Sequence, residues 1–536
     1  LVDTNGVFPG NIFCSTLIHT GDTFYDAGVR ALDEANASYI FSDIIIENLT
    51  LDGNKAQNQV GDTGLNASAM GAGVSIHQCK NVTVRGCRII NNRMDGVHVG
   101  YTLHGGSDHC NITGNYFEGN QRTNIALITG KYNTVSYNSG TATTGGTGVN
   151  AGAALDIEAN FTDEVNYRHT IIGNRLGGQL GFVSVLTAKL QDTTCSGNVW
   201  VGSLALSGSA LTSGCVIDGD TFIAKTSTDD WLLRTGPNTA PTTVRPTLIK
   251  DCTVSGFARV IPAIGAGGHE NFVVEGCTFS TESFGSITRG YRVKFRNNDF
   301  YFSGNADPDT IALSNTLGGT VPNQGQVEFR GNKFYGVSNA SFFTLSRDAS
   351  WPLAKNDFMF TGNDVRVTGA TYTFTTPSSM TIEDNKIKNF KPISIASIDS
   401  FRLIDNYIEA ASAENLFANQ SSTFKDAEIV GNDLTFVTIN LTRPKDTTIC
   451  ANRIIDGHIA LIYSFTSSGV GRCHVSFNRM TAKSVIANPF VVTTGGSFLV
   501  GDFVGNDQYK YNTYTDYTGG ASIAGAVVGA YDGTFN

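Results

Sequence analysis

The chain has 536 residues, a formal net charge of −10 at pH 7 and 16% charged residues, which is a low charged fraction for a soluble protein. The negative charge argues against nucleic acid as a partner, because nucleic-acid binding requires a basic stripe, although a local Arg and Lys cluster could still bind an anionic sugar. No stretch of about 18 apolar residues is present, so we expect no membrane insertion.

Residues 1–40 precede a repeat that occupies most of the chain, and we expect them to form an N-terminal cap segment. The sequence does not begin with basic residues followed by a long apolar run, which argues against a signal peptide. No obvious cap stands at Leu1, and this suggests that an N-terminal part precedes this sequence.

The repeat is predicted over residues 41–480 and is clearest in three segments, Met380–Ile387, Phe401–Ile408 and Ala427–Leu434. Each has an apolar residue three positions before an Asn and another two positions after it. The positions that correspond to this Asn, called anchors below, are spaced on average about 27 residues apart. They are Leu49, Cys87, Asn115, Asn138, Asn174, Asn198, Asp220, Cys252, Cys277, Asn298, Asn332, Asn363, Asn385, Asn406, Asn432, Asn452 and Asn478. Two residues after an anchor, only Gly140 lacks a large apolar side chain.

This pattern predicts an all-β solenoid of about 17 coils, a right-handed parallel β-helix. Before each anchor, apolar and polar residues alternate, as in Val82-Thr83-Val84, so the strand turns one face inward. We expect the anchor itself to occupy a sharp corner, because Asn tolerates left-handed backbone dihedrals. A repeat of this length cannot bury its apolar face alone and has to stack on its neighbours.

Beyond Asn478 the repeat fades, and residues 481–536 are expected to supply closing strands and a cap or trimer contact. Pro489–Val492 and Ser497–Val500 have the composition of closing strands. The apolar segment Ile523–Val528 would be a liability on an exposed end, which favours a subunit contact there.

The ten cysteines do not have the pattern of a disulfide framework. Cys87, Cys252 and Cys277 are anchors, and Cys195 lies in an inward apolar column. We interpret them as small buried residues of a protein assembled in a reducing compartment. No Cys or His set has zinc spacing, so no metal and no cofactor are expected.

Two early segments, Phe41–Asn54 and Asn81–Asn92, resemble the first coils of pectate-lyase-like β-helix proteins. Within that superfamily, the chain is most similar to bacteriophage tailspikes, because of its unpaired cysteines, irregular loops and Gly/Tyr-rich end. The resemblance covers about residues 40–480 and implies a homotrimer that binds and cleaves bacterial surface polysaccharide, either capsule or O-antigen. It also implies a virion tail protein acting at the host cell surface, attached to the tail or baseplate through an N-terminal part.

The chain departs from relatives with known chemistry. The Asn-Thr-Asp and Gly-His-Gly motifs of polygalacturonases are missing, and no carboxylate cluster has the calcium-binding pattern of pectate lyases. The resemblance is therefore specific for the fold and weak for the chemistry.

Asp156 and Glu158 are the first candidates for catalysis, because glycoside hydrolysis requires two carboxyl groups. Leu155 and Ile157 should point into the core, which leaves Asp156 and Glu158 outward and roughly 6.6 Å apart along the strand. That distance is nearer the separation of inverting enzymes, about 6.5–9.5 Å, than that of retaining ones. The ordinary alternative is that both are solvated surface residues.

The surroundings of this pair supply candidate substrate-binding residues. Aligning Val97, Ile125 and Leu155 places His98, Ala126 and Asp156 in one outward column, where the small Ala126 leaves room for a sugar. The adjoining loop adds Asp163, Glu164, Tyr167 and Arg168 as possible sugar contacts.

A second candidate site is Asp229-Asp230-Trp231 with Arg234. Asp229 and Asp230 would be its carboxyl groups, and Trp231 could stack on a sugar face or lie in the core.

Two further interpretations remain open. A lyase that acts by β-elimination would need a base and a cation, and His98, Tyr101, His104 and Arg122 lie close together in the sequence. A non-catalytic glycan-binding adhesin would use the same scaffold with outward aromatic side chains and no productive carboxyl pair.

Overall fold

The computed structural model describes the chain in segments, and the statements below concern these residues. They are residues 6–7, 13–14, 18–20, 41–54, 72–92, 94–100, 106–143, 152–159, 165–184, 189–207, 212–235, 245–261, 270–288, 291–304, 309–315, 326–337, 341–347, 357–368, 372–375, 379–395, 398–418, 424–442, 444–464, 471–486, 490–495, 499–504, 506–511 and 530–531. The regular elements in these ranges are strands. The described residues contain no helix that is long and apolar enough to cross a membrane.

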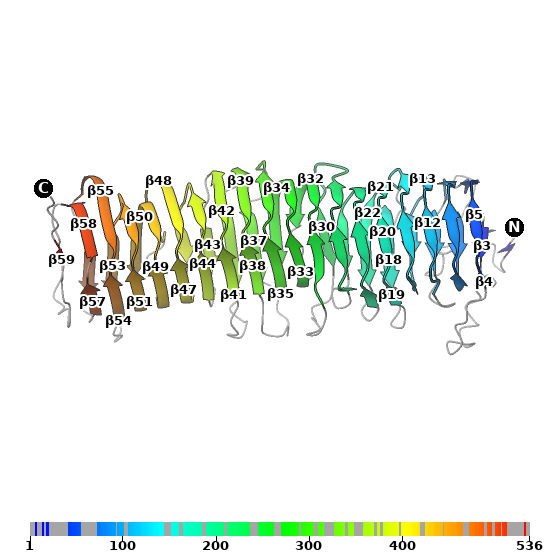
Figure 1. Ribbon diagram of the computed structural model, residues 1–536. Helices are drawn as coiled ribbons and strands as arrows, with labels where there is room; N and C mark the ends of the chain where they lie inside the picture. The colour runs from blue at the N-terminus through cyan, green and yellow to red at the C-terminus, as the bar shows by residue number, and fades with distance from the viewer. Residues whose placement is uncertain are drawn as a thin grey trace. The chain divides into compact units, whose positions relative to one another are not determined.

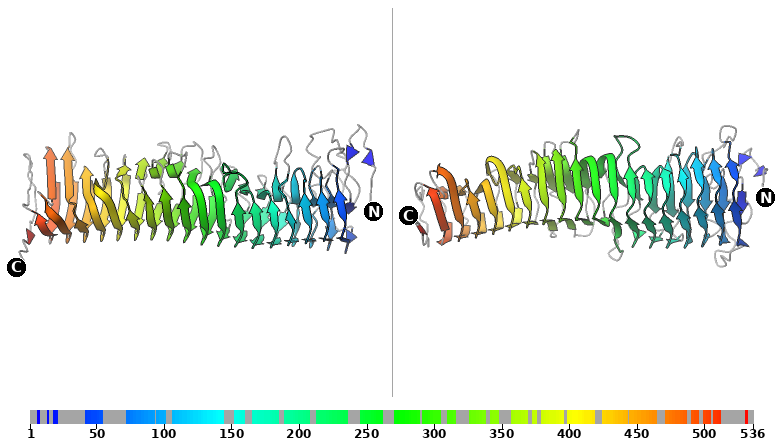
Figure 2. Two further views of the ribbon diagram at one scale, coloured as in Figure 1. Left: turned by 90° about the horizontal axis from the view of Figure 1, so that it is seen from above. Right: turned by 45° about the horizontal axis from the view of Figure 1, so that its top comes forward.

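The chain divides into two compact units, which are described separately. Unit 1 comprises Leu1–Pro262 and Asn271–Phe279, and unit 2 comprises Ala263–Glu270 and Ser280–Asn536. In both units the strands stack in parallel, one rung above the next (Figure 1). Figure 2 shows the same stacking of rungs within each unit from two further directions.

Unit 1 contains three long parallel sheets, a short sheet at one corner, and an antiparallel pair formed by β1 (Gly6–Val7) and β2 (Phe13–Cys14). The first sheet contains β3 (Ile18–Thr20), β7 (Val74–Ile76), β11 (Val97–Val99), β14 (Thr123–Leu127), β18 (Ala153–Ala159), β22 (Gln179–Ser184), β26 (Leu204–Ser207) and β30 (Leu232–Thr235). The second contains β5 (Ile45–Glu47), β9 (Thr83–Arg85), β12 (Asn111–Thr113), β16 (Thr134–Ser136), β20 (Thr170–Ile172), β24 (Thr194–Ser196), β28 (Val216–Asp218), β31 (Thr247–Lys250) and β33 (Glu270–Glu275). The third contains β6 (Thr50–Asp52), β10 (Arg88–Ile90), β13 (Tyr116–Glu118), β17 (Ser139–Gly140), β21 (Arg175–Gly177), β25 (Val199–Val201), β29 (Thr221–Ile223) and β32 (Thr253–Ile261).

The chain passes from the first sheet to the second through a corner, and there it forms short parallel strands. These are the pair β4 (Phe41–Ser42) and β8 (Cys79–Lys80), and a four-stranded sheet, called the corner sheet below. The corner sheet contains β15 (Gly130–Lys131), β19 (Val165–Tyr167), β23 (Lys189–Gln191) and β27 (Thr212–Ser213).

Unit 2 repeats the arrangement with longer strands in three parallel columns. The first column contains β35 (Tyr291–Arg296), β38 (Gln326–Arg330), β41 (Asp357–Thr361), β44 (Ser379–Glu383), β47 (Ile398–Ile404), β49 (Phe424–Val430), β51 (Pro444–Cys450), β54 (Gly471–Ser476) and β57 (Leu499–Val504). The second contains β36 (Asp299–Phe302), β39 (Lys333–Val337), β42 (Asp364–Thr368), β45 (Lys386–Lys388), β48 (Tyr407–Asn415), β50 (Asp433–Thr442), β52 (Arg453–Ile455), β55 (Arg479–Ile486), β58 (Asn506–Tyr511) and β59 (Ala530–Tyr531). The third contains β34 (Thr278–Thr288), β37 (Asp309–Asn315), β40 (Ser341–Arg347), β43 (Tyr372–Thr375), β46 (Ile393–Ile395), β53 (Ile459–Ser464) and β56 (Phe490–Gly495).

Strands in parallel register continue outside the predicted repeat range of 41–480. Before it, β3 pairs with β7. After it, β56 pairs with β53 and β57 pairs with β54. Ile523–Val528 lies outside the described residues.

The predicted inward columns form the core. The apolar residue three positions before each anchor is buried on every rung, from Ile46 to Val475. Large aromatic side chains fill the interior of unit 2, where Phe295 stacks on Phe329 at 5.2 Å and Phe300 on Phe334 at 5.0 Å between ring centroids. Since burial of one such side chain contributes about 1.5–3 kcal/mol, the repeated columns supply most of the stabilisation.

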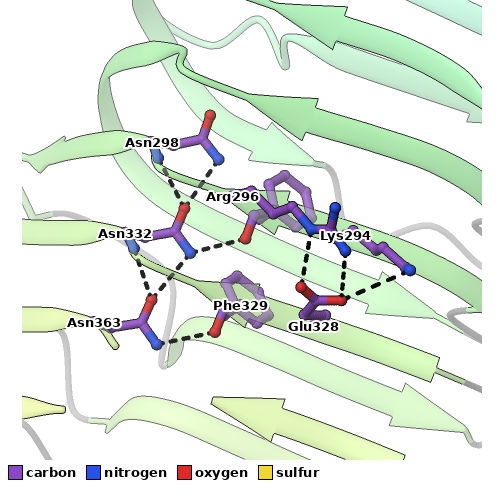
Figure 3. A network of polar contacts seen from close by, with 8 residues as sticks. Lys294, Arg296, Asn298, Glu328, Phe329, Asn332 and Asn363 are labelled. Carbon is purple, nitrogen blue, oxygen red and sulfur yellow. Dashed lines mark hydrogen bonds and ion pairs between the residues drawn. The ribbon is translucent and has the colours of Figure 1, made fainter. Parts of the chain in front are cut away.

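The Asn anchors point inward and form a hydrogen-bonded ladder. Figure 3 shows three rungs of it: the Asn298 Nδ2 and Asn332 Nδ2 groups each donate to the Oδ1 atom of the next Asn, at 3.0 and 3.1 Å. Asn332 Nδ2 also donates to the carbonyl of Phe295 at 2.9 Å. Buried amides are therefore satisfied by the rungs on either side.

The expected corner role of the anchors is wrong by one residue. The left-handed conformation belongs to the residue before the anchor, for example Gly114 before Asn115 and Asp405 before Asn406. The physical reason is that the anchor side chain must project into the core to reach its neighbours, so the preceding residue makes the turn. Leu49, the first anchor, is 44% exposed because no described rung precedes it.

The cysteines whose side chains the structure describes carry free thiols, as expected. Cys79, Cys87, Cys110, Cys195, Cys215, Cys252 and Cys277 are buried, and Cys450 is half-buried. Where two cysteines follow each other in the ladder, the Cys252 backbone N–H donates to Cys277 Sγ at 3.4 Å, so sulfur replaces the amide oxygen.

Candidate active site

The first sheet of unit 1 has the register that the sequence predicts around Asp156. Val97, Ile125 and Leu155 are paired in adjacent strands, and so are His98, Ala126 and Asp156. The next strand places Gly181 beside Asp156. Asp156 thus lies between two residues with little or no side chain, Ala126 and Gly181.

Asp156 and Glu158 are buried, although they alternate with the core residues Leu155 and Ile157. Asp156 is 4% exposed and Glu158 is 9% exposed. The ordinary interpretation of this pair as solvated surface residues is therefore wrong. Charged side chains on an outward strand face are normally exposed to solvent, and these two differ because they are buried.

Asp95 organises the polar groups near this pair. It lies in the turn before β11, and the next rung supplies Arg122 and Thr123. Arg122 Nε donates to Asp95 Oδ1 at 2.8 Å, and Thr123 Oγ1 donates to the same oxygen at 2.6 Å. His98 Nδ1 lies 2.8 Å from Asp95 Oδ2.

The turn that holds Asp95 requires a glycine after it. A Cβ atom on Gly96 would lie 2.5 Å from the Asn124 carbonyl oxygen and 2.6 Å from a ring carbon of Phe117. The close approach of the two rungs at this point brings Asp95 within reach of Arg122 and Thr123.

Charge and hydrogen bonding determine the protonation state of Asp95. Burial alone would raise the pKa of this carboxyl, but the Arg122 charge and the hydrogen bonds from His98 and Arg122 outweigh burial and lower it. Burial would lower the pKa of Arg122, and the Asp95 carboxylate raises it instead. Asp95 and Arg122 therefore form a charged pair, with Arg122 still 17% exposed.

The pKa values of the Asp156 and Glu158 carboxyl groups are raised, whereas that of Asp95 is lowered. Burial, followed by the charge of Glu158, raises the pKa of Asp156 well above its usual value. Burial also raises the pKa of Glu158, and Arg122 partly opposes this rise. The interaction between the two carboxyls raises the pKa of Asp156 and lowers that of Glu158, so Asp156 keeps its proton to a higher pH.

The expected separation of the two carboxyls, roughly 6.6 Å along the strand, stays a prediction. Asp156 Oδ1 is buried and has no hydrogen-bond partner among the described residues, so the pair retains acceptor capacity.

The structure brings together His98, Arg122, Asp156 and Glu158 of the predicted site residues. His98 is 1% exposed and bound to Asp95, so it is a buried partner of the carboxylates rather than the surface sugar contact that we expected. Asp95 was missed by sequence reasoning. Extending the predicted register two residues back from Val97 would have placed it beside Thr123 and Arg122.

Other predicted residues lie elsewhere. Tyr167 ends β19 of the corner sheet and Arg168 follows it, on a different sheet from Asp156. Tyr101, His104, Asp163 and Glu164 lie outside the described residues.

The second candidate site has structural roles. Asp229 Oδ2 accepts hydrogen bonds from the backbone N–H groups of Lys225 and Thr226 at 3.0 and 2.8 Å, which closes a turn. Asp230 lies 3.8 Å from Arg259. Only the strand position of Arg234, in β30, is described.

Trp231 is fully buried, so the prediction that it stacks on a sugar is wrong. Its ring packs edge-on against Phe222 and Phe279, at 5.8 and 5.1 Å between centroids. Trp231 directly precedes β30, the last strand of the first sheet.

The side chains around Asp156 and Glu158 do not have the arrangement of a metal centre. Within the described ranges, no group of three or more His, Cys, Asp or Glu side chains could hold a metal ion.

Comparison with known proteins supports the fold. The family model described as "Right handed beta helix region" matches residues 24–222, less than half of the chain. Together with the parallel rungs, this match confirms the expected right-handed parallel β-helix. No curated protein matches the sequence.

Three solved structures are similar at low levels. The N-terminal fragment of bacteriophage Phi29 gene product 12 is 12% identical with a TM-score of 0.38, over 95% of this chain and 85% of that one. A mutant of the family PL6 alginate lyase AlyGC is 10% identical with a TM-score of 0.25, over 88% and 86%. A mannuronic acid-specific family 6 polysaccharide lyase from human gut microbiota is 8% identical with a TM-score of 0.16, over 74% and 81%. Identities and TM-scores this low assign no activity to the chain.

Proposed function

We propose that this protein binds and cleaves a bacterial surface polysaccharide, a capsule or an O-antigen, by glycoside hydrolysis. The observation that carries the proposal is the buried pair of Asp156 and Glu158, two carboxyl groups on one strand beside Arg122. A carboxyl group with a raised pKa keeps its proton near neutral pH, which is what a general acid requires.

In the proposed mechanism Asp156 is the general acid and Glu158 is the base. Asp156 donates its proton to the glycosidic oxygen of the leaving sugar, and Glu158 accepts a proton from the attacking water. Arg122 and Asp95 lie near the pair, where the Arg122 charge lowers and the Asp95 charge raises the pKa of both carboxyls. Because both carboxyls are buried, substrate binding must expose them to admit the sugar and the water.

The first test is a digestion assay on a panel of bacterial surface polysaccharides, following new reducing ends and ultraviolet absorbance together. We expect reducing ends without absorbance. The variants Asp156→Asn and Glu158→Gln should each lower the cleavage rate by about 10²–10⁴-fold while polysaccharide binding persists. The turn-closing Asp229→Asn variant is the matched control and should keep full activity. Full activity in both Asp156 and Glu158 variants would refute the site.

The raised pKa of Asp156 also predicts the pH dependence of cleavage. The general acid is active only while protonated, so kcat/KM should fall as pH rises through the raised pKa of the pair. A rate that falls only as pH decreases, as protonation of Glu158 would cause, and does not fall as pH rises would assign no acid role to Asp156.

One observation favours a lyase as the second candidate. The Arg122 cation and the His98–Asp95 pair lie at the same site, and a β-eliminating enzyme needs a base and a cation that neutralises a uronate carboxylate. Reducing ends that appear with ultraviolet absorbance would support the lyase. Binding without either signal would support a non-catalytic adhesin.

The proposal includes the setting that the sequence resemblance implies: a homotrimeric tailspike carried on the virion tail and acting at the host cell surface. Light scattering of the purified chain measures its molar mass directly. A trimer is expected, and a stable monomer at micromolar concentration would contradict this part of the proposal.

A further inference from the structure

The corner between the corner sheet and the second sheet of unit 1 has an unusual backbone. One residue per rung adopts the left-handed conformation there. These residues are Asp43, Asn81, His109, Tyr132, Arg168, Asp192 and Gly214, with φ of 59°, 58°, 55°, 57°, 54°, 54° and 65°. Three consecutive rungs therefore place a bulky side chain, His109, Tyr132 or Arg168, in a conformation that favours Gly, Asn and Asp.

The neighbouring corner shows what the fold prefers at such positions. Before the anchors of unit 1, the left-handed residues are Asn48, Gly86, Gly114, Tyr137, Gly173, Gly197, Gly219, Asp251 and Gly276. Tyr137 is an isolated exception there. Three bulky residues in succession are thus not required by the corner, and backbone strain of this kind is typical of functional sites.

The strained side chains form one continuous series of contacts. The rings of His109 and Tyr132 stack with centroids 5.0 Å apart. Tyr132 meets the edge of Tyr167 at 5.9 Å, and the Arg168 guanidinium lies 4.7 Å from the centre of the Tyr167 ring. Such aromatic and cation–π contacts orient long side chains that would otherwise be mobile on a surface.

The series continues through charged groups. Arg168 Nε lies 3.9 Å from Asp192 Oδ2, and Arg245 is paired with the same carboxylate. A Cβ atom on Gly214 would lie 2.8 Å from the Arg245 guanidinium carbon, so the glycine makes room for this side chain. We call His109, Tyr132, Tyr167, Arg168, Asp192 and Arg245 the corner ladder.

The corner ladder remains accessible and carries a positive charge. Tyr132 is 41% exposed, and the side chains of Arg168 and Arg245 are 55% and 63% exposed. Lys131, next to Tyr132, is also exposed. Arg168 and Arg245 thus flank one partly buried carboxylate, which leaves one positive charge beyond this pairing in a chain whose formal net charge is −10.

We propose that the corner ladder is a binding site for an acidic polysaccharide, separate from the Asp156 and Glu158 site. Sugar rings pack their C–H faces against aromatic side chains, and arginine pairs with carboxylates. From His109 to Arg245 the ladder covers six rungs. Five steps of about 4.8 Å span about 24 Å, which accommodates several sugar units in a row. The inference rests on the proposed function in that the ligand is a glycan, and it does not depend on cleavage.

Binding to immobilised polysaccharides tests the proposal. The probes are hyaluronan, polygalacturonate and polysialic acid, with dextran as the neutral control, at low and high salt. We expect the full chain to bind at least one acidic probe, more weakly at high salt, and not to bind dextran. Tyr132→Asn and Arg168→Asn should each weaken that binding by at least about tenfold. Binding to none of the acidic probes, or equal binding to dextran, would overturn the proposal.

Tyr137→Asn is the matched control. Tyr137 is 67% exposed and has the same left-handed conformation, but it lies on the other corner. This variant should bind as the unaltered chain does. The melting temperature separates binding from structure: Asn fits the left-handed backbone better than Tyr, so Tyr132→Asn should not lower it. A lowered melting temperature with retained binding, or a change in molar mass, would show that the ladder supports the fold or a subunit contact.

Cleavage and ladder binding can fail independently. If Asp156→Asn abolishes cleavage and Tyr132→Asn changes neither KM nor binding, the active-site proposal stands and the ladder proposal falls. If no polysaccharide is cleaved but acidic probes bind in a Tyr132-dependent manner, the ladder proposal stands without the hydrolase.

Discussion

Asp220 shows how one residue adapts the inward ladder to its neighbours. Its Oδ1 accepts the Asn198 backbone N–H at 2.8 Å, and its Oδ2 accepts the Trp200 Nε1–H at 2.8 Å. An Asn here would direct an N–H group at the indole N–H, whereas a carboxylate accepts both donors. The Asp at this anchor is therefore explained by the Trp two residues after the preceding anchor.

This arrangement buries the Asp220 carboxyl group. Its burial predicts that the free energy of unfolding depends on pH. Burial raises the pKa of Asp220 to about 6, although the hydrogen bonds from Trp200 and Asn198 oppose the rise. Between the ordinary pKa and about 6, the native chain keeps a proton that the unfolded chain has lost. The free energy of unfolding should therefore fall as pH rises through this window, by roughly 3 kcal/mol from this group.

The variant Asp220→Asn should flatten that slope, measured by urea denaturation at several pH values. It loses the acceptor for Trp200 at every pH, so the test concerns the slope and not the absolute stability. Asp218→Asn is the control, because Asp218 is a partly exposed carboxylate paired with Lys250. An unchanged slope in Asp220→Asn would contradict the assignment.

At the scale of the element, the rung depends on its anchor more than on any single apolar residue. Asn138 Oδ1 accepts both the backbone N–H and the Nδ2 group of Asn115 at 3.0 Å. Its own Nδ2 donates to the Ile112 carbonyl at 2.8 Å and to Asn174 Oδ1 at 2.9 Å. One side chain thus joins three successive rungs.

Removing the Asn138 side chain should lower the free energy of unfolding. Asn138→Ala leaves two buried donors of Asn115 without their acceptor, and we expect a loss of about 3 kcal/mol in the free energy of unfolding. Asn138→Cys should cost less, because Cys252 and Cys277 show that Sγ can accept the backbone N–H of the preceding anchor. The exposed Ser139→Ala variant is the control. Equal losses for Ala and Cys would show that packing, and not hydrogen bonding, holds the rung.

At the scale of the whole molecule, a solenoid transmits instability only through adjacent rungs. Phe334 is fully buried in unit 2 and stacks between Phe300 at 5.0 Å and Phe360 at 6.0 Å. Phe334→Ala should cost about 3–5 kcal/mol, because it leaves a cavity inside this aromatic stack.

Hydrogen exchange measures how far that loss spreads. Protection should fall most in β36, β39 and β42, less in rungs further along unit 2, and not in unit 1. The exposed Lys333→Ala variant on the same strand is the control. A uniform loss of protection in both units would instead show that they unfold as one cooperative block.

The sequence by itself determined the coil and much of its register. The alternation of apolar residues around each anchor is local and repeats on every rung, so it predicted the inward columns, the free buried cysteines, and the alignment of His98, Ala126 and Asp156. It failed by one residue at the corner, because residue type alone does not distinguish an Asn that turns from an Asn that stacks.

Only the tertiary structure decided the chemistry. That Asp156 and Glu158 are buried, and that Asp95 holds Arg122 near them, depends on contacts between different rungs. The burial of Trp231 and the contacts of the corner ladder have the same origin. The distance along the chain from one rung to the next varies with each inserted loop, so the strand pattern fixes which residues face outward but not which of them meet.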